Sequence, residues 1–351
     1  MARVMIKNFV RKCLYESGAL GLYHRWRNAD SLTVVMFHRT LRPDDPRWES
    51  CDPDYTLAES LFVASLAFFK RHYRVVSLEE VLRAHRDGGG LPSRALLITF
   101  DDGWLDNVDY AMPALRMAGL PAVMFVAADA IGARQPFYQE RIIAGWRLGK
   151  LGLGDLADTV VAHGGVRPDR DDLGGLRQLI AQIERLTEAQ RRTVLDRHAG
   201  ALGDGLQHMV DAADLPRLRA GGIELGLHGK SHVPLTRALD VDAELIGARE
   251  AMATSLSTPE GTASIACATM SFPHGAFDEG IAARAHAAGY RLLFTSVPVL
   301  NRVGSRPSSL LGRSGYETST VADGHGRFRP DWLASYLFRL PTRRLSGPGS
   351  S

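Results

Sequence analysis

The chain has 351 residues, with 42 Lys and Arg against 39 Asp and Glu, so its formal net charge is +3. Hydrophobic residues make up 45% and charged residues 23%, values typical of a packed globular protein. This composition excludes disordered, collagen-like and low-complexity classes for most of the chain, and so small a net charge gives no indication of a nucleic-acid binder.

The three cysteines, Cys13, Cys51 and Cys267, lie far apart and form no CxxC motif. We expect neither a disulfide framework nor a cysteine zinc site, and a reducing compartment fits this usage best. No apolar run reaches the ~18 residues that a membrane span needs. Basic residues interrupt the apolar residues of the N-terminus, so no export signal is predicted and a cytoplasmic location is expected.

Residues 1–30 combine apolar and basic side chains, as in Phe9 and Val10 beside Arg11 and Lys12. Two interpretations of this amphipathic segment stay open. The pattern favours a helix that caps the domain. The alternative is a segment that lies on an anionic membrane surface, which would place the protein peripherally at the inner membrane face.

From residue 31 onward, short apolar runs alternate with helical patterns. In chain order we predict the strand Leu32–Phe37, the helix Leu57–Phe69, the strand Arg74–Val76, a helix opened by the capping box of Ser77 and Glu80, the strand Ala95–Phe100, the helix Tyr110–Ala118, the strands Pro121–Ala127 and Ile223–Leu227, a helix at 240–255, the strand Ala268–Phe272, a helix at 278–288, and the strands Leu292–Thr295 and Leu310–Leu311. This alternation predicts a mostly parallel sheet with helices outside it, either a barrel or an open sheet.

A segment from about 133 to 218 interrupts the alternation. Apolar residues from Leu176 to Leu186 keep a helical period, and Thr187 with Gln190 forms a second capping box. We therefore predict a helical insertion that covers part of the site rather than an independent domain. The expected organisation is a basic segment at 1–30, an α/β domain at 31–320, and a C-terminal helix at 321–351 with a disordered tail from Leu345.

Polar side chains follow four of the predicted strands directly. In chain order these are His38, the pair Asp101 and Asp102, the pair His228 and His232, and the turn Pro273-His274-Gly275. In α/β sheets and barrels the residues beyond the carboxyl ends of the strands converge on the active face. We therefore expect the four clusters to meet in one site.

Each cluster alone has an ordinary interpretation. Adjacent aspartates before glycine are often a solvated turn or a helix N-cap, and histidines four apart can simply share one face of a helix. Together, however, two such histidines and a carboxylate can hold a divalent metal and leave positions open for water and substrate. His38 then lies where a hydrolase needs a proton donor, and the Pro273–Gly275 turn could bring a backbone N–H to a developing oxyanion.

These motifs resemble the polysaccharide deacetylase family, which is carbohydrate esterase family four and carries the NodB-homology domain. Thr99–Gly103 matches its TFDDG motif completely, and His228–His232 matches the HxxxH core of its H-(S/T)-x-x-H motif. Phe272–Gly275 resembles the third motif, R-x-P-x-G. The similarity covers roughly residues 32–130 and 220–315 and leaves the helical insertion outside it.

The resemblance implies a distorted (β/α) barrel, often of seven strands, and a metal-dependent hydrolase that removes N-acetyl groups from a sugar, a polysaccharide or a lipid-linked glycan. It implies Asp101 as the general base, and Asp102, His228 and His232 as the metal ligands. His274 would supply a backbone N–H to the oxyanion. Such ligands suit Zn²⁺ best, although Co²⁺, Ni²⁺ or Fe²⁺ would fit similar donors.

The sequence departs from the wider family at three places. The C-terminal L-x-x-x-x-H motif has no clear match, and Met36-Phe37-His38 instead looks like the N-terminal Y-H motif of permuted branches, such as the deacetylases of bacterial poly-N-acetylglucosamine. His38 would then be the general acid. Gly229 replaces a Ser or Thr that steadies the metal loop, and Ser271 stands where many members have an Arg that orients the base. Arg313 is our candidate to replace that arginine.

Two other functions stay open. One is hydrolysis of another non-peptide C–N bond, and the other is carbohydrate binding or assembly without catalysis on the same scaffold. Asp101 argues against the second, because binding alone needs no base beside a ligand set. Trp104 and Phe277, near the motifs, could stack on sugar rings or belong to the core.

Overall fold

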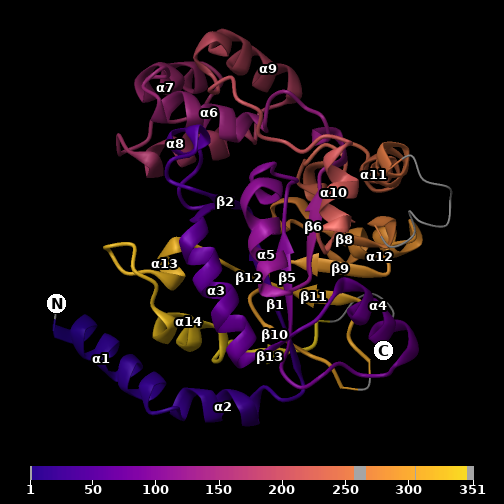
Figure 1. Cartoon of the computed structure of the whole chain (residues 1–351). Coiled ribbons are helices and arrows are strands. Elements are labelled where there is room, and N and C mark those ends of the chain that lie inside the picture. The colour runs from indigo at the N-terminus through magenta and orange to yellow at the C-terminus, as the bar shows by residue number, and fades with distance from the viewer. Residues whose placement is uncertain (1, 257–265, 305, 346–351) are drawn as a thin grey trace. The chain divides into compact units, whose positions relative to one another are not determined.

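The computed structural model describes residues 2–256, 266–304 and 306–345 (Figure 1). The disordered tail predicted from Leu345 therefore lies almost wholly outside the described residues. The chain divides into two compact units. We call them the sheet unit, which comprises Met1–Leu41, Asp54–Ala133 and Val210–Ser351, and the helical unit, which comprises Arg42–Pro53 and Arg134–Met209.

The sheet unit is built on one large sheet of eleven strands, in the order β11-β9-β8-β7-β6-β5-β1-β10-β13, with β12 paired to β1 and β4 paired to β5. The strands are β1 (Ser31–Phe37), β4 (Arg74–Val75), β5 (Ala95–Phe100), β6 (Ala122–Val126), β7 (Ile223–Leu227), β8 (Thr269–Ser271), β9 (Leu292–Thr295), β10 (Leu300–Arg302), β11 (Leu310–Gly312), β12 (Ser314–Gly315) and β13 (Thr342–Arg343). All of these strands pair in parallel except β1 and β10. A second, small sheet pairs β2 (Arg39–Leu41) with β3 (Thr56–Ala58).

The structure confirms a mixed α/β fold with a mostly parallel sheet, but it does not confirm a closed barrel of seven strands. Backbone hydrogen bonds among the described strands leave β11 as one edge of the sheet. The side chain of Asn301, on β10, bridges toward that edge instead: it donates to the carbonyls of Leu32 at 3.2 Å and Gly312 at 2.8 Å, and accepts from the Gly312 N–H at 2.7 Å. The strands that the sequence did not predict have two or three residues, too few to show a period of two.

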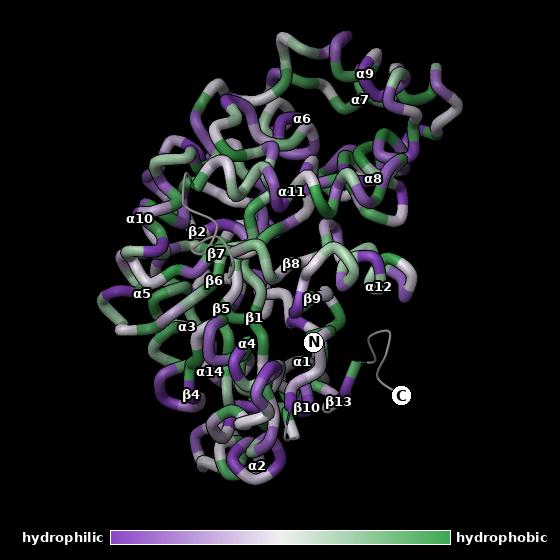
Figure 2. The backbone as a smooth tube through the Cα atoms, turned by 90° about the vertical axis from the view of Figure 1, so that its right-hand side faces the viewer, coloured by the Kyte–Doolittle hydropathy of each residue, from purple (hydrophilic) through white to green (hydrophobic). Residues whose placement is uncertain are grey.

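The central strands are buried on both faces, as parallel strands under helices are. All six residues of β5 are buried, and they alternate between two cores. Leu96, Ile98 and Phe100 join the larger core, whereas Ala95 and Leu97 join the smaller one. Figure 2 shows the tube mainly in hydrophobic colours along β1 and β5.

Helices complete the sheet unit, and α3 and α5 lie in front of the central strands in Figure 1. The helices are α1 (Ala2–Glu16), α2 (Ala19–Arg27), α3 (Glu59–His72), α4 (Leu78–Asp87), α5 (Met112–Ala118), α10 (Asp214–Ala220), α11 (Val241–Leu256), α12 (Glu279–Ala287), α13 (Thr318–Val321) and α14 (Pro330–Leu337). The predicted capping box opens α4: Ser77 accepts from the Glu80 N–H at 3.1 Å, and the Glu80 carboxylate accepts from the Ser77 N–H at 2.8 Å. No helix in the described ranges combines the length and apolarity needed to cross a bilayer.

The helical unit contains α6 (Tyr138–Arg147), α7 (Leu153–Val161), α8 (Leu173–Ile183) and α9 (Glu188–Arg197), which enclose a core of their own. Thr187 and Gln190 form the predicted capping box at the start of α9. The earlier segment Arg42–Pro53 also belongs to this unit, which no pattern in the sequence indicates. Within the unit, Arg177 on α8 donates to Asp52 at 2.5 Å, which ties that segment to the helices.

Candidate metal centre

The four predicted polar clusters lie at the carboxyl ends of neighbouring strands. His38 follows β1, Asp101 follows β5, and His228 follows β7, while Ser271 is the last residue of β8. In the sheet, β1 lies next to β5, and β7 lies between β6 and β8. The register pairs Phe37 with Phe100, and the Asp101 N–H donates to the Phe37 carbonyl at 3.0 Å. Parallel pairing therefore brings residues distant in sequence to one edge.

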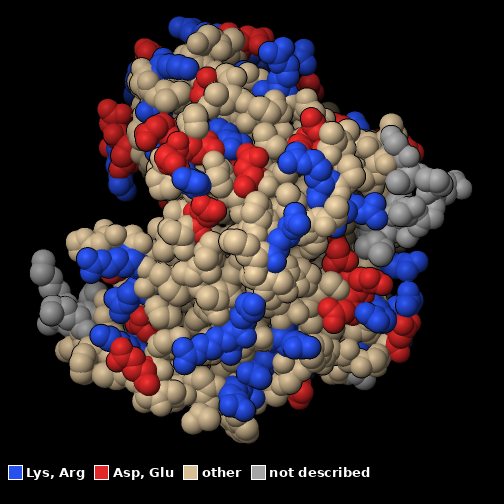
Figure 3. Space-filling view, in the orientation of Figure 1, with Lys and Arg blue, Asp and Glu red and all other residues tan. Residues whose placement is uncertain are grey.

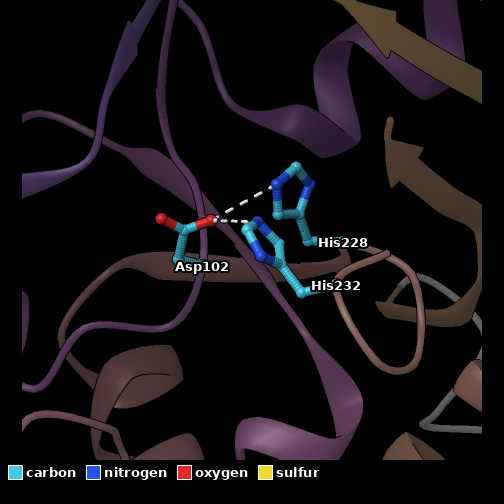
Figure 4. A group of neighbouring side chains, drawn as sticks. All are labelled: Asp102, His228 and His232. Carbon is cyan, nitrogen blue, oxygen red and sulfur yellow. Dashed lines mark ion pairs between the residues drawn. The ribbon is translucent and has the colours of Figure 1, made fainter. Parts of the chain in front are cut away.

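Asp102, His228 and His232 form a compact group (Figure 4). The Asp102 Oδ1 lies 3.3 Å from His228 Nε2 and 3.1 Å from His232 Nε2. One ligand atom from each residue lies within 4.8 Å of the others, close enough to share one ion. Asp102 and His228 are buried, and His232 is half-buried.

The hydrogen bonds of His228 fix which of its nitrogens carries the lone pair. Its Nδ1 lies 3.0 Å from the Ser271 carbonyl oxygen, which can only accept, so Nδ1 carries the hydrogen. In the neutral ring, Nε2 then turns a lone pair toward the Asp102 oxygen. Two electron-pair donors 3.3 Å apart need a cation between them, either a proton or a metal ion. The donor set of two imidazoles and a carboxylate suits a divalent transition metal.

The ionisation of these groups follows from their neighbours. Burial opposes the charged form of Asp102, yet His232 and His228 hold the pKa of its carboxyl well below the usual value. Burial likewise opposes protonation of His228, but the Asp101 and Asp102 carboxylates raise its pKa. The centre is thus a carboxylate that attracts positive charge.

Asp101 faces the same centre and is held by Arg313. The guanidinium Nη1 and Nη2 donate to the two carboxylate oxygens at 2.7 and 2.8 Å. Nη2 also donates to Ser271 Oγ at 2.6 Å, Nη1 reaches Thr99 Oγ1 at 3.4 Å, and Nε donates to the Thr295 carbonyl at 3.1 Å. Every guanidinium N–H therefore has an acceptor, although Arg313 is fully buried.

The Ser271 hydroxyl completes this arrangement by donating to Asp101 Oδ2 at 3.2 Å. Burial would raise the pKa of the Asp101 carboxyl, but Arg313 and His228 hold it below the usual value. Asp101 is consequently an ionised carboxylate. It lies 3.9 Å from His228 Nε2 and is not one of the three candidate metal ligands.

Trp104 holds Asp102 through a hydrogen bond. Its indole Nε1–H donates to Asp102 Oδ2 at 2.9 Å, and the Arg39 guanidinium lies 4.3 Å from the centre of its ring. Arg39 in turn makes a fully buried ion pair with Asp106, at 2.7 Å. Trp104 is only 2% exposed, so of its two interpretations the structure favours the core over a sugar platform. Phe277 is half-buried and stacks on Phe272, with ring centroids 4.9 Å apart.

The backbone at the centre is strained. Among the described residues, four other than glycine have a left-handed φ, and three of them are Asp102 (78°), His232 (63°) and His274 (56°). Such conformations cost on the order of 1–3 kcal/mol each and persist where the surroundings impose them. Their concentration here indicates a functional site.

The loop between the two histidines is held by a residue that the sequence did not indicate. Glu244, on α11, accepts from the backbone N–H groups of Lys230 and Ser231 at 3.0 and 2.9 Å, and from the Ser231 hydroxyl at 2.5 Å. Gly229 has a φ of 69°, and a Cβ there would lie 2.9 Å from the Pro273 ring. A Ser or Thr at this position would be crowded, so Glu244 steadies the loop in its place.

The two remaining histidines, His38 and His274, also lie near this group. Burial lowers the pKa of His38, although Asp102 and Asp101 are close enough to oppose the shift. The His38 ring contacts Tyr55, with centroids 4.8 Å apart. The His274 ring packs on His232, with centroids 4.7 Å apart, and its Nε2 lies 3.2 Å from the His232 carbonyl oxygen. Pro273 and His274 thus abut the metal loop.

Comparisons with known proteins find a matching family model and solved structures with the same fold. A family model described as polysaccharide deacetylase matches residues 88–163. Solved structures with the same fold include the deacetylase PplD of Streptococcus pyogenes in complex with acetate, with a TM-score of 0.55 and 13% identity over 88% of this chain and 99% of that one. IcaB from Ammonifex degensii has a TM-score of 0.54 and 15% identity over 89% of this chain and 98% of that one. A de-N-acetylase from Aggregatibacter actinomycetemcomitans has a TM-score of 0.51 and 13% identity over 81% of this chain and 94% of that one. No curated protein matches the chain by sequence.

The family match over residues 88–163 indicates a hydrolase that acts on non-peptide C–N bonds, and the solved structures share the fold of this chain. More specifically, residues 88–163 are similar to a polysaccharide deacetylase, and Asp102, His228 and His232 form a candidate metal site.

Proposed function

We propose that this protein removes N-acetyl groups from an N-acetylated sugar, polysaccharide or lipid-linked glycan. The observation that carries the proposal is the buried Asp102 group beside a second carboxylate, Asp101, that Arg313 holds ionised and oriented. Metal binding alone would not require this second carboxylate. The printed name of the Aggregatibacter structure, a de-N-acetylase, supports an acetamide as the bond that is cleaved.

Asp102, His228 and His232 would hold the divalent cation, most simply Zn²⁺, with Co²⁺, Ni²⁺ or Fe²⁺ as alternatives. When bound, such a metal lowers the pKa of a water molecule and polarises a carbonyl group. The protein supplies the orientation: Ser271 fixes the tautomer of His228, Trp104 fixes Asp102, and Glu244 fixes the loop that carries His232.

In this proposal Asp101 accepts the proton of the attacking water. Its two oxygens each receive a hydrogen bond from Arg313, which keeps the carboxylate from rotating and keeps it ionised. His38 protonates the departing amine. The turn at Pro273 and His274, packed against His232, is the candidate to face the oxyanion.

The position of His38 supports the permuted arrangement of the catalytic motifs. It follows β1, and the register of β1 with β5 sets it beside Asp101. An acid from the first strand can thus reach the same carboxyl-end site as an acid from a C-terminal motif. A cytoplasmic location, and the insertion as a cover of the site, remain predictions.

Acetate release from an N-acetylglucosamine oligomer, with and without a chelator, tests the proposal. Asp101→Asn should reduce turnover by about 10²–10⁴-fold while metal binding is retained, whereas His232→Ala should lose both. The exposed Asp44→Asn serves as the matched control. Intact metal binding without acetate release from any N-acetylated sugar would favour the binding protein, and release of another acyl group or amine would favour the other C–N hydrolase.

A further inference from the structure

The first two helices present their apolar side chains to solvent. On α1, Ile6, Phe9, Val10 and Leu14 are exposed and follow helical spacing, and Phe9 is 68% exposed. A surface helix of a globular protein normally turns such a stripe toward the core. Here the opposite face packs inward: Tyr15 stacks on Phe68 with centroids 6.5 Å apart.

The second helix repeats the pattern. Leu22, Tyr23 and Trp26 are exposed, Trp26 by 84%, while Leu20 and His24 face inward and are buried. Seven of the sixteen exposed large hydrophobic side chains among the described residues thus belong to α1 and α2. The two helices pack on the sheet unit through Tyr15, Leu20 and His24, as a cap would, but their larger apolar side chains face solvent. We call the exposed side chains of the two helices the apolar face.

Cations border the apolar face. Arg25, Arg71 and Arg94 line a surface hollow of about 730 Å³ between α2 and the end of α3, and Glu16 is the one carboxylate among its lining residues. Figure 3 shows Lys and Arg side chains gathered on the part of the surface where α2 and the end of α3 lie in Figure 1. Guanidinium groups bind phosphate oxygens through paired N–H donors.

From the apolar face and its basic border we infer that α1 and α2 dock this protein on a bilayer that contains anionic phospholipids. Aromatic and aliphatic side chains would enter the boundary between headgroups and acyl chains, and the arginines of the hollow would bind lipid phosphates. Charge complementarity favours this occupant, because a second copy would bring the same three arginines against one another.

The docking surface lies away from the catalytic edge. Asn28 follows α2 directly, and its carbonyl accepts from the hydroxyl of Ser31, the first residue of β1, at 2.9 Å. His38, the proposed general acid, follows the last residue of the same strand. Docking would therefore set the location of the protein, and hydrolysis of a soluble substrate would not depend on it.

Sedimentation of the full chain with vesicles tests the inference, and vesicles of phosphatidylcholine alone are compared with vesicles that also contain phosphatidylglycerol. We expect binding to the anionic vesicles that weakens with salt. Phe9→Glu combined with Trp26→Glu should weaken it by about tenfold or more, and Arg25→Ala with Arg71→Ala should abolish the preference for phosphatidylglycerol. Leu239→Glu with Met117→Glu is the matched control, since these apolar side chains are also highly exposed but lie elsewhere in the sheet unit.

Equal vesicle binding by the wild type and the Phe9/Trp26 variant would overturn the inference, as would no binding by the wild type. Self-association without vesicles that the same variant abolishes would assign the face to a second copy instead. Circular dichroism and acetate release from a soluble oligomer should be unchanged in every variant. Because vesicle binding needs no turnover, failure of the proposed function and failure of the docking inference are distinguishable.

Discussion

Arg313 and Asp101, 212 residues apart in the chain, form a two-point ion pair in which Nη1 and Nη2 lie 2.7 and 2.8 Å from the two carboxylate oxygens. Because all five N–H donors of Arg313 are engaged, the side chain has one fixed orientation and imposes it on Asp101. A lysine at this position would keep the charge but lose the fork.

We predict that Arg313→Lys lowers kcat for acetate release by about 10²-fold with little change in metal content, because the base is misplaced while the ligands are intact. A double-mutant cycle checks the cause. In an Asp101→Asn background, Arg313→Lys should cost little more, since the group that it positions is already gone. Arg329→Lys, which alters a similar two-point pair with Asp331 outside the site, is the control. Equal losses in both backgrounds would mean that Arg313 does not act through Asp101.

The hydrogen bond from Trp104 to Asp102 can be tested for its effect on metal binding. Trp104→Phe keeps a ring under Arg39 but removes the indole N–H that reaches Asp102 Oδ2. Loss of a hydrogen bond to a ligand weakens metal binding by about 10–100-fold, and we expect that range for Zn²⁺ in competition with a chelating dye. Trp332→Phe is the matched control, because the Trp332 Nε1 has no hydrogen-bond partner within the described residues. Unchanged affinity in Trp104→Phe would show that the ligand needs no such support.

How much of this site the sequence could predict depends on how far apart in the chain the interacting residues lie. His38, Asp101 and His228 could be predicted at the ends of strands, because a buried apolar run followed by a polar residue is a local pattern in the sequence. The same signal located β1, β5, β7 and β9 to within one residue. The resemblance to the family then suggested what each residue does.

The contacts that hold the site were less visible in the sequence. Glu244 lies in a helix whose pattern is ordinary, and nothing near it marks the loop that it holds. Arg39 and Asp106 lie 67 residues apart, and only pairing across the fold makes their charges partners. Arg313 was found only because the usual arginine was missing at Ser271, and its exact contacts required the packed structure.

Glu244 gives a third prediction. Glu244→Ala should weaken Zn²⁺ binding by about tenfold, because the backbone N–H groups of Lys230 and Ser231 lose their acceptor and the loop carrying His232 is released. Glu244→Gln retains a side-chain oxygen and should recover most of the affinity. Isothermal titration with metal measures both variants, with Glu250→Ala, an exposed residue on the same helix, as the control. If Ala and Gln behave alike, the hydrogen bonds do not position the loop.

The fourth prediction concerns His24, which is 1% exposed and packs between Tyr73 and Phe338. Its Nε2 lies 3.2 Å from the His72 carbonyl oxygen and its Nδ1 lies 2.9 Å from Asn28 Nδ2, an arrangement that suits the neutral ring. Burial lowers its pKa from 6.5 to about 3. The unfolded chain takes up this proton near pH 6.5 and the folded chain does not, so His24 stabilises the fold above pH 6.5 and that contribution is lost as the pH falls toward 3.

The loss is at most about 1.4 kcal/mol per pH unit within this window. His24→Phe preserves the stacking but removes the titration and both hydrogen bonds. We expect the variant to be less stable than the wild type by about 1–3 kcal/mol at pH 7.5. This gap in the free energy of unfolding should narrow toward pH 4.5, because only the wild type loses stability there by leaving His24 unprotonated in the folded state. Urea unfolding at several pH values measures the gap, and the exposed His325→Phe should show none. A gap that stays constant with pH would mean that His24 binds protons equally in the folded and unfolded states, and that its burial does not hold the ring neutral.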